Sequence, residues 1–299
     1  MTIRIGTSET GGTFYTQGEA IADLLNRTSA DSAEFELRTS LASIDNANRL
    51  HRGEIEFGFM ASNWAPRAVQ GTTPFEHPVP LRMVSPANAG PIFFITRADS
   101  RIKSVSDVVG QRVIIGPKTS GMTQHVHTIF NTLGISFDDF TPLYLSFPEG
   151  AEALCAGQAD VQFQCPIPNQ VMTDLSNKAE VKVLPYASGQ IEHILSKIPF
   201  YRPVVMREGA FRGLHQDIDQ IAVLNVIVSH EHVDTALVHR FASTMIENAD
   251  HLAQTNPLFD GLRDLYEPLR SQGAQALEID GVPLHPGAIQ AYREAGYLA

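Results

Sequence analysis

Five short polar segments of this chain have residue types suited to holding a small molecule. The first, Thr7-Ser8-Glu9-Thr10-Gly11-Gly12-Thr13-Phe14-Tyr15, follows an apolar stretch and precedes residues with helical spacing. Glycine lets a backbone approach a ligand closely, and a helix N-terminus presents unpaired N–H groups and a positive dipole end that favour anions. The same residues would also form a plain strand-to-helix turn whose hydroxyls only cap the helix. For this segment alone, both interpretations stay open.

The other four polar segments each follow an expected strand. They are Thr39-Ser40-Leu41-Ala42-Ser43-Ile44-Asp45-Asn46, Ser62-Asn63-Trp64, Thr119-Ser120-Gly121-Met122 and Gln164-Cys165-Pro166-Ile167-Pro168-Asn169. Ser40 or Ser43 can simply cap the following helix. Ligands of open α/β sheets, however, bind beyond the carboxyl ends of the parallel strands. Five polar segments at such ends favour a binding site more than any one of them does.

Motifs for catalysis, cofactors and metals are missing from the sequence. No segment has the GxGxxG, GxxxxGK[ST], HExxH or GxSxG spacing. His125 and His127 are two apart on an expected helix and so point to different faces, while His230 and His232 flank Glu231. Neither lysines nor paired carboxylates form a recognisable catalytic set. We therefore expect no enzyme activity, no cofactor and no metal.

The two cysteines, Cys155 and Cys165, are too few for a zinc site, and their spacing is not CxxC. Free cysteine is a common core residue, so we expect two buried side chains. A disulfide between them would depend on geometry that the sequence does not fix, and their pairing stays open.

Length and composition indicate a globular protein of two domains. The chain has 299 residues, of which 43% are hydrophobic and 18% charged. Its net charge of -11 argues against a nucleic-acid partner, because phosphate binding requires basic surface, but not against a small anionic or zwitterionic ligand. No run approaches the roughly 18 apolar residues of a membrane span. No leader precedes the first expected strand, so we expect either a cytoplasmic protein or a mature periplasmic chain whose leader was removed.

Strand-like and helix-like segments alternate, and the same order occurs twice. A strand, a glycine-containing turn, a helix, a strand, a helix and a strand are expected over residues 3–62 and again over 112–169. The second helix ends similarly in both, at Arg52-Gly53-Glu54-Ile55-Glu56-Phe57 and at Ala156-Gly157-Gln158-Ala159-Asp160-Val161. This alternation predicts parallel sheets flanked by helices. The expected fold class is α/β with two lobes and a cleft between them, although such repetition can also arise from α/β architecture alone.

The remaining segments set the expected lobe boundaries. Apolar runs predict strands over 81–85, 93–96, 201–206 and 221–229, and one long helix over 233–251. The strand over 201–206 is expected to return the chain to the first lobe. Lobe one would then comprise residues 1–90 and 203–299, and lobe two residues 91–202.

The chain also resembles a known family, the TAXI-type solute receptors of TRAP transporters (tripartite, ATP-independent, periplasmic). The resemblance runs from end to end and is most specific near the C-terminus. The matching segments are Ile3-Arg4-Ile5-Gly6-Thr7, Gly11-Gly12-Thr13-Phe14-Tyr15, residues 39–46, Asp99-Ser100-Arg101-Ile102-Lys103-Ser104, Gly110-Gln111-Arg112-Val113, Ser120-Gly121, Gly157-Gln158-Ala159-Asp160, Pro199-Phe200-Tyr201, Pro283-Leu284-His285-Pro286-Gly287-Ala288-Ile289 and Tyr292-Arg293-Glu294-Ala295-Gly296.

The resemblance implies a type II periplasmic-binding-protein fold, in which each lobe is a mostly parallel sheet flanked by helices. It also implies a monomeric periplasmic protein that closes on a small organic acid or amino acid, glutamate-like or dicarboxylate-like, and delivers it to TRAP membrane subunits. The residues that match the family's pocket are Thr13, Tyr15, Ser43, Asn46, Ser62, Ser120, Gly121, Met122 and Asn169. To these we add four residues of the polar segments: Gly11, Gly12, Phe14 and Gln164.

This sequence departs from the family's pattern at several of these positions. The family often has Gly-Gly-Ser where this chain has Leu41-Ala42-Ser43, and Glu-Asn where it has Asp45-Asn46. It usually has Ser-Gly-Thr where this chain has Ser120-Gly121-Met122, and Gln164-Cys165-Pro166 is unusual. Exchanging a hydroxyl for a soft apolar side chain would reshape the pocket. These departures affect the expected ligand more than the expected fold.

Three functions fit these observations. The leading hypothesis is a binding protein without catalysis, whose ligand is held between the Gly11-Gly12-Thr13 and Ser120-Gly121 turns. The alternative is a cytoplasmic enzyme, decarboxylase-like, on the same fold; the missing leader and the eleven histidines fit it, but an acid–base set is lacking. The third is a ligand-sensing module for a signalling partner.

Overall fold

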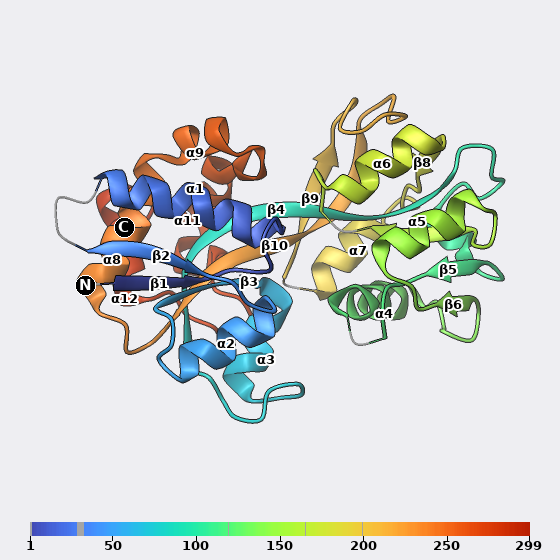
Figure 1. Cartoon of the computed structure of the whole chain (residues 1–299). Coiled ribbons are helices and arrows are strands. Elements are labelled where there is room, and N and C mark those ends of the chain that lie inside the picture. The colour runs from blue at the N-terminus through green and yellow to red at the C-terminus, as the bar shows by residue number, and fades with distance from the viewer. Residues whose placement is uncertain (1, 29–32, 119, 165, 199) are drawn as a thin grey trace. The chain divides into compact units, whose positions relative to one another are not determined.

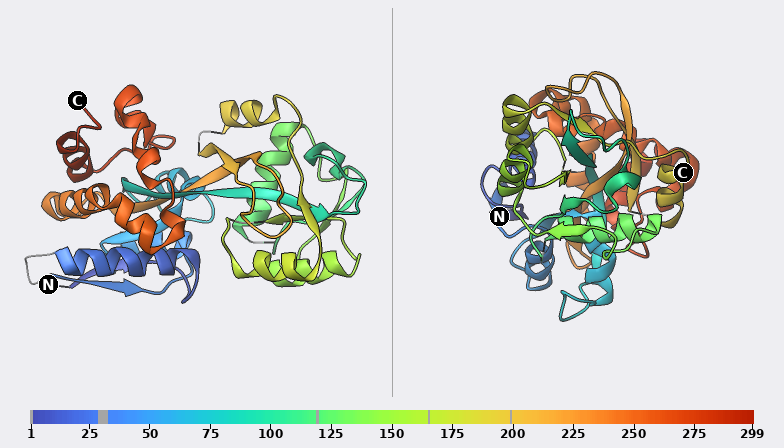
Figure 2. Two further views of the ribbon diagram at one scale, coloured as in Figure 1. Left: turned by 90° about the horizontal axis from the view of Figure 1, so that it is seen from above. Right: turned by 90° about the vertical axis from the view of Figure 1, so that its right-hand side faces the viewer.

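Two units make up the computed structural model (Figure 1, Figure 2), which describes residues 2–28, 33–118, 120–164, 166–198 and 200–299. Unit 1 comprises Met1–Ala89 and Leu224–Ala299, and unit 2 comprises Gly90–Val223. The chain passes between them within two long neighbouring strands, β4 (Leu81–Arg97) and β10 (Ile218–His230). β9 (Tyr201–Met206) pairs with the first half of β10, so both belong to unit 2 and the chain returns to unit 1 after Val223. The sequence predicts this return near residue 203.

Unit 1 is built on three parallel strands. β1 (Thr2–Gly6) lies between β2 (Glu34–Arg38) and β3 (Phe57–Ala61), and the second half of β10 runs antiparallel beside β3. Alternation within β1 buries Ile3 and Ile5 completely. α1 (Thr13–Thr28) covers one face of this sheet, and α2 (Ser43–His51) and α3 (Ala65–Gln70) cover the other (Figure 1). The three polar segments that follow β1, β2 and β3 therefore share one edge.

The C-terminal part of the chain completes unit 1 with short helices. They are α8 (Thr235–Glu247), α9 (Ala249–Thr255), α10 (Leu262–Tyr266), α11 (Pro268–Gln272) and α12 (Pro286–Glu294), with 3-10 turns at Pro257–Phe259 and Gly273–Ala276. The prediction of one long helix over 233–251 was wrong, because the helix breaks at Asn248. The Asn248 side chain donates to the carbonyl of Thr244 at 2.8 Å. An asparagine that bonds the backbone in this way competes with helix continuation.

Unit 2 repeats the three-stranded parallel arrangement. β5 (Arg112–Ile114) lies between β6 (Thr141–Leu143) and β7 (Val161–Gln164), and β4 runs antiparallel beside β7 and β8 (Val181–Val183). The helices of this unit are α4 (Gly121–Leu133), α5 (Phe147–Cys155), α6 (Gln170–Lys178) and α7 (Gln190–Lys197), and 3-10 turns lie at Ser62–Trp64 in unit 1 and Val105–Val108 in unit 2.

The separate strands predicted over 81–85 and 93–96 are one continuous strand, β4, so this prediction was wrong. Pro86, Gly90 and Pro91 are typical strand breakers in a sequence. Here they stay extended, and Asn88 accepts a hydrogen bond from the Asn225 side chain on β10 at 3.1 Å. A buried side-chain bond thus supports the strand where the sequence pattern suggests a break.

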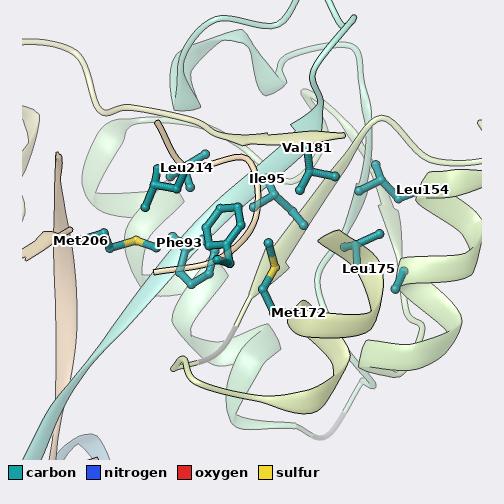
Figure 3. Close-up of a cluster of buried hydrophobic side chains, with 11 residues drawn as sticks. Phe93, Ile95, Leu154, Met172, Leu175, Val181, Met206 and Leu214 are labelled. Atoms are coloured by element: carbon teal, nitrogen blue, oxygen red, sulfur yellow. The ribbon is translucent and has the colours of Figure 1, made fainter. Parts of the chain in front are cut away.

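A hydrophobic cluster of unit 2 fixes α5 and α6 on β4 (Figure 3). Phe93 and Ile95 of β4 are fully buried and pack with Leu154 of α5 and with Met172 and Leu175 of α6. Full burial of such a side chain contributes about 1.5–3 kcal/mol. This cluster therefore holds α5 and α6 against β4. Among the described residues, no helix is both long and apolar enough to span a membrane.

Candidate functional site

The turn after β1 requires both of its glycines. Gly11 has a φ of 79°, which L side chains rarely adopt. A Cβ added at Gly12 would lie 2.5 Å from the Ser8 hydroxyl oxygen, and this hydroxyl accepts a hydrogen bond from the Tyr15 N–H at 3.3 Å. The turn thus brings bare backbone to the surface directly before the first turn of α1, as a ligand cradle would need.

Side chains behind this turn tie the three strand ends together. Asn46 is fully buried, and its amide donates to the carbonyls of Thr7 and Phe59, both at 2.8 Å. The Ser40 hydroxyl donates to the same Thr7 carbonyl at 2.9 Å. Asn46 therefore holds the ends of β1 and β3, and its contact with a ligand stays a prediction. Its Oδ1 has no hydrogen-bond partner among the described residues.

The start of α2 is strained and exposes an apolar side chain. Ala42 has a φ of 66° and a ψ of -142°, a conformation that favours glycine. Leu41 beside it is 78% exposed. The Ser43 hydroxyl accepts from the N–H of Ala61 at the end of β3, at 3.0 Å. Ser43 thus joins α2 to β3, whereas Leu41, like Thr39, is exposed to solvent.

The remaining predicted residues of unit 1 divide into core and surface. Phe14 is buried and stacks on Phe59, with ring centroids 5.4 Å apart, and Ser62 is fully buried. Thr13 and Tyr15, in the first turn of α1, stay half-buried. Of these four, Thr13 and Tyr15 are the ones whose side chains can meet a ligand from solution.

In unit 2 the turn after β5 leads into α4. The Ser120 hydroxyl accepts from the Thr123 N–H at 3.3 Å, and the Thr123 hydroxyl in turn donates to the Pro117 carbonyl at 2.8 Å. Met122 is buried, and its Cβ lies 2.7 Å from the position of a Cβ added at Gly116. Met122 therefore packs over the turn, with Ser120 and Gly121 half-buried at its surface. Thr119 lies outside the described residues.

The end of β7 carries a buried amide with no partner. Gln164 is fully buried, and neither its Nε2 nor its Oε1 has a hydrogen-bond partner among the described residues. Asn169 caps α6: its side chain accepts from the Met172 N–H at 2.8 Å and donates to the Pro166 carbonyl at 3.0 Å. An unpaired buried amide calls for an explanation such as a bound molecule or water. Cys155 is half-buried, whereas Cys165 lies outside the described residues. Whether the two cysteines pair is therefore not tested.

The sequence prediction missed two buried polar residues at equivalent places in the two units. Gln17 of α1 is fully buried, and both its amide atoms lack partners among the described residues. His125 of α4 is hydrogen-bonded through Nδ1 to the Tyr201 hydroxyl at 2.8 Å, and burial lowers the pKa of His125 to about 4. A usable signal existed, because each lies on the apolar face of its helix, as Gln17 does between Phe14 and Ile21.

Three of the helices that follow these strand ends begin with charges that suit an anion, whereas α2 has Asp45 in its first turn. α1, α4 and α6 have no acidic residue in the first turn, so their positive dipole ends are not neutralised from within. Among the described residues, no group of histidine, cysteine, aspartate and glutamate side chains is arranged to hold a metal ion.

Known structures share this fold at low sequence identity. The periplasmic sulfonate-binding protein SsuA of Methylobacillus flagellatus KT matches with a TM-score of 0.58 and 13% identity, over 99% of this chain and 95% of that one. A TctC solute-binding protein from Polaromonas matches with a TM-score of 0.57 and 15% identity, over 99% and 96%. These likenesses confirm the predicted α/β periplasmic-binding-protein fold.

A family model extends the comparison to the sequence itself. It describes the NMT1-like family and matches residues 5–296, which is nearly the whole chain. The match includes all five strand-end segments and the two glycines of the first turn. The chain therefore belongs to the NMT1-like family.

Proposed function

We propose that this protein is a periplasmic solute-binding protein, without catalysis, that captures a small organic acid or amino acid for a TRAP-type secondary transporter. The fold, the family and the resemblance to TAXI-type receptors support this function. The observation that carries it is the set of helix N-termini at the strand ends: α1, α4 and α6 begin without an acidic residue, next to polar turns. Such ends attract carboxylates.

The amide atoms of Gln17 and Gln164 are closed to solvent, so they can contribute to binding only if the ligand uncovers them. Leaving a buried polar group unpaired costs about 1–3 kcal/mol, and neither side chain has a partner among the described residues. An amide offers both donors and an acceptor, which suits a ligand with a carboxylate and a hydroxyl, keto or amino group.

The ligand is further proposed to contact the Gly11-Gly12-Thr13 turn of unit 1 and the Ser120-Gly121 turn of unit 2 at the same time. A ligand favours a closed state only if it binds that state better than the open one. Contacts to both turns would provide this difference in affinity. Substitutions in either unit should then weaken binding of the same molecule.

Thermal unfolding of the purified protein tests the proposal directly. Dicarboxylates, keto acids and amino acids would be added one by one, and the melting temperature measured. A ligand present at a hundredfold excess over its Kd stabilises the folded state by about 2.7 kcal/mol, which corresponds to a shift of several degrees. If no compound of these classes shifts the melting temperature, the proposed ligand class is wrong.

Matched variants locate the site. Thr13→Val in unit 1 and Ser120→Ala in unit 2 should each reduce the shift, whereas Ser271→Ala, at an exposed position of α11, should not. Loss in only one of the two site variants would contradict shared contact with both turns. The transporter itself is tested by reconstituting TRAP membrane subunits in vesicles and measuring uptake that depends on this protein.

A further inference from the structure

The end of β6 presents an aromatic ring to solvent at the strand-end edge of unit 2. Tyr144 directly follows β6 and is 39% exposed. Leu143 and Leu145, on either side of it, pack against the buried cluster of Ile114 on β5 and Ala153 on α5. The two leucines therefore anchor the chain on both sides of Tyr144 and leave its ring outside this cluster.

Lys118, in the segment that follows β5, lies over this ring. Its Nζ is 5.2 Å from the centre of the Tyr144 ring, which is a cation–π distance. Because β5 and β6 are neighbouring parallel strands, both residues stand at the same edge of the sheet as the Ser120-Gly121 turn. The ring thus fixes the place of an ammonium group in the segment that leads into α4.

This ammonium group is available to an anion. Lys118 is exposed and has no ion-pair partner among the described residues. Glu149, the carboxylate that follows β6, instead accepts from the N–H and the hydroxyl of Ser146, at 2.9 and 2.7 Å, in the capping box of α5. The first turn of α4 has no acidic residue. In the described part of this edge, the charge of Lys118 is therefore not neutralised.

The segment after β5 consequently offers two separate attractions for negative charge. The N–H groups at the start of α4 favour one carboxylate. The Lys118 ammonium, with three donors and no acceptor, favours another through charge-assisted hydrogen bonds. The net charge of -11 repels a dianion more strongly than a monoanion, so a dianion needs local positive charge of this kind in order to bind. A ligand with a single carboxylate leaves one of the two attractions unused.

We infer that Lys118, positioned by Tyr144, is a specificity-determining residue that selects ligands with two carboxylates over ligands with one. The inference rests on the proposed function and deepens it, because it names the class of acid as a dicarboxylate whose second carboxylate binds Lys118. Tyr144 is a positioning residue: its ring holds the ammonium group and need not touch the ligand.

Calorimetric titration with matched pairs of compounds tests this inference. Succinate, glutarate and L-glutamate are compared with succinamate, glutaramate and L-glutamine, in which an amide replaces one carboxylate. At least one of the three diacids should bind at least tenfold more tightly than its amide, a difference of about 1.4 kcal/mol. Binding of acid and amide with the same Kd in every pair would overturn the inference.

Variants assign the preference for the diacid to Lys118. Lys118→Met should raise the Kd of the preferred diacid about tenfold and leave the Kd of its amide nearly unchanged. Lys178→Met, at the exposed last residue of α6, should change neither Kd. Tyr144→Leu should reduce the preference about threefold, whereas Tyr144→Phe, which keeps the ring, should retain it. The altered side chains are exposed, so the melting temperatures without ligand should stay close to that of the wild type.

The outcomes separate a failure of this inference from a failure of the proposed function. If none of the acids binds to the wild-type protein, the proposed ligand class and the role of Lys118 are both wrong. If a diacid binds and Lys118→Met keeps the full preference over the amide, the ligand class stands and only the role of Lys118 is wrong. Equal losses in Tyr144→Phe and Tyr144→Leu would show that the ring does not position the ammonium group.

Discussion

Arg4 in unit 1 and Arg112 in unit 2 make the same contacts on the first parallel strand of their units. Each guanidinium pairs with a carboxylate, Glu56 at 2.6 Å and Asp160 at 2.7 Å, and each also donates to the glycine carbonyl three residues earlier, at 2.9 Å. Each backbone N–H donates to the same carboxylate. The similar helix endings of the sequence are thus one structural device used twice, which joins the first strand to the loop before the third.

The two units differ in the space between their second helix and third strand. In unit 1, Asn46 of α2 lies opposite Gly58 of β3, and a Cβ added at Gly58 would be 3.1 Å from the Asn46 Cβ. In unit 2 the sizes are exchanged: Gln162 of β7 lies over Gly150 of α5 and donates to the Phe147 carbonyl at 3.0 Å. A buried amide is placed here in both units, from the helix in one and from the strand in the other. In both units a buried amide therefore packs against a glycine of the facing element, and the two units differ in which element carries which.

The first helix of each unit shows a second difference. Gln17 is the fifth residue of α1, and His125 is the fifth residue of α4. Both are buried, but only His125 can take up a proton. Unit 2 therefore carries a pH sensitivity at a position where unit 1 has none.

The largest expected effect on stability is that of His125→Gln, which gives unit 2 the glutamine that unit 1 has at this position. Burial lowers the pKa of His125 to about 4, so below the ordinary value of 6.5 the unfolded chain binds a proton that the folded chain does not. The free energy of unfolding should therefore fall as the pH drops from 6.5 toward 4, by roughly 3 kcal/mol in total, from about 1.4 kcal/mol per pH unit. His125→Gln should remove this fall. Urea unfolding between pH 4 and 7.5 measures it.

His193→Gln, at an exposed position of α7, is the control and should leave the pH dependence as it is. If wild type and His125→Gln lose stability in parallel as the pH falls, the ring of His125 is not the group responsible.

The next largest effect on stability is expected at Gly150 of α5, where the small residue faces the long side chain of Gln162 on β7. In Gly150→Ala the new Cβ would lie 2.6 Å from the Gln162 Nε2 and 2.8 Å from the Ile114 side chain. Such overpacking costs about 1–3 kcal/mol. Combining it with Gln162→Ala should be less destabilising than the sum of the two single changes, with a coupling of about 1 kcal/mol. Equilibrium unfolding of the four proteins of this cycle measures the coupling.

Glu152→Ala, on the exposed side of α5, serves as the matched control and should show no coupling to Gln162→Ala. Strict additivity of Gly150→Ala and Gln162→Ala would mean that the two residues do not share this space.

Much of the repeated framework could be predicted from the sequence. The order of strands and helices in each unit matches the prediction, and the strand over residues 201–206 has the predicted bounds, because apolar alternation and capping residues are local signals. The polar strand-end segments were also found, since parallel strands place their carboxyl ends on one edge.

The hydrogen-bond partner of each polar side chain could not be predicted from the sequence. Asn46 bonds the carbonyl of Thr7, 39 residues away, and Ser43 bonds the N–H of Ala61. These partners are backbone groups, which every residue has, so no residue type in the sequence marks them. The same limit applies to Gln164, whose unpaired state depends on everything packed around it.

A smaller effect on the free energy of unfolding is expected for the ion pairs Arg4–Glu56 and Arg112–Asp160, which we call the clamps of unit 1 and unit 2. The pKa of Asp160 is lowered, chiefly by the hydrogen bond from Arg112 and despite partial burial. Its contribution to stability is therefore present at neutral pH and lost as the pH falls below the ordinary value near 3.8. Asp160→Asn should cost about 1 kcal/mol at pH 7, a modest figure because the pair is partly exposed to solvent. Glu56→Gln should cost a similar amount in unit 1 at pH 7, and chemical unfolding at that pH compares the two variants. Chemical unfolding of Asp160→Asn near pH 3 checks that its cost disappears there. A cost confined to one unit would show that the two clamps are not equivalent.

The smallest expected effect on stability concerns the N-terminal ends of α2 and α5, the second helices of the two units. α5 begins with Ser146 at a φ of -63°, in a capping box with Glu149, whereas α2 begins with Ala42 at a φ of 66° and no side-chain cap. Ala42→Gly should relieve strain of about 1–3 kcal/mol, less the cost of a more flexible unfolded chain, and so raise stability by about 1 kcal/mol. Ala20→Gly, inside α1, should instead lower it by about 1 kcal/mol. If Ala42 is strained, thermal unfolding shows a higher melting temperature for Ala42→Gly and a lower one for Ala20→Gly. If both melting temperatures fall, unit 1 accommodates alanine at position 42 without strain. Leu41-Ala42-Ser43 would then be as relaxed a helix start as the capped start of α5 in unit 2.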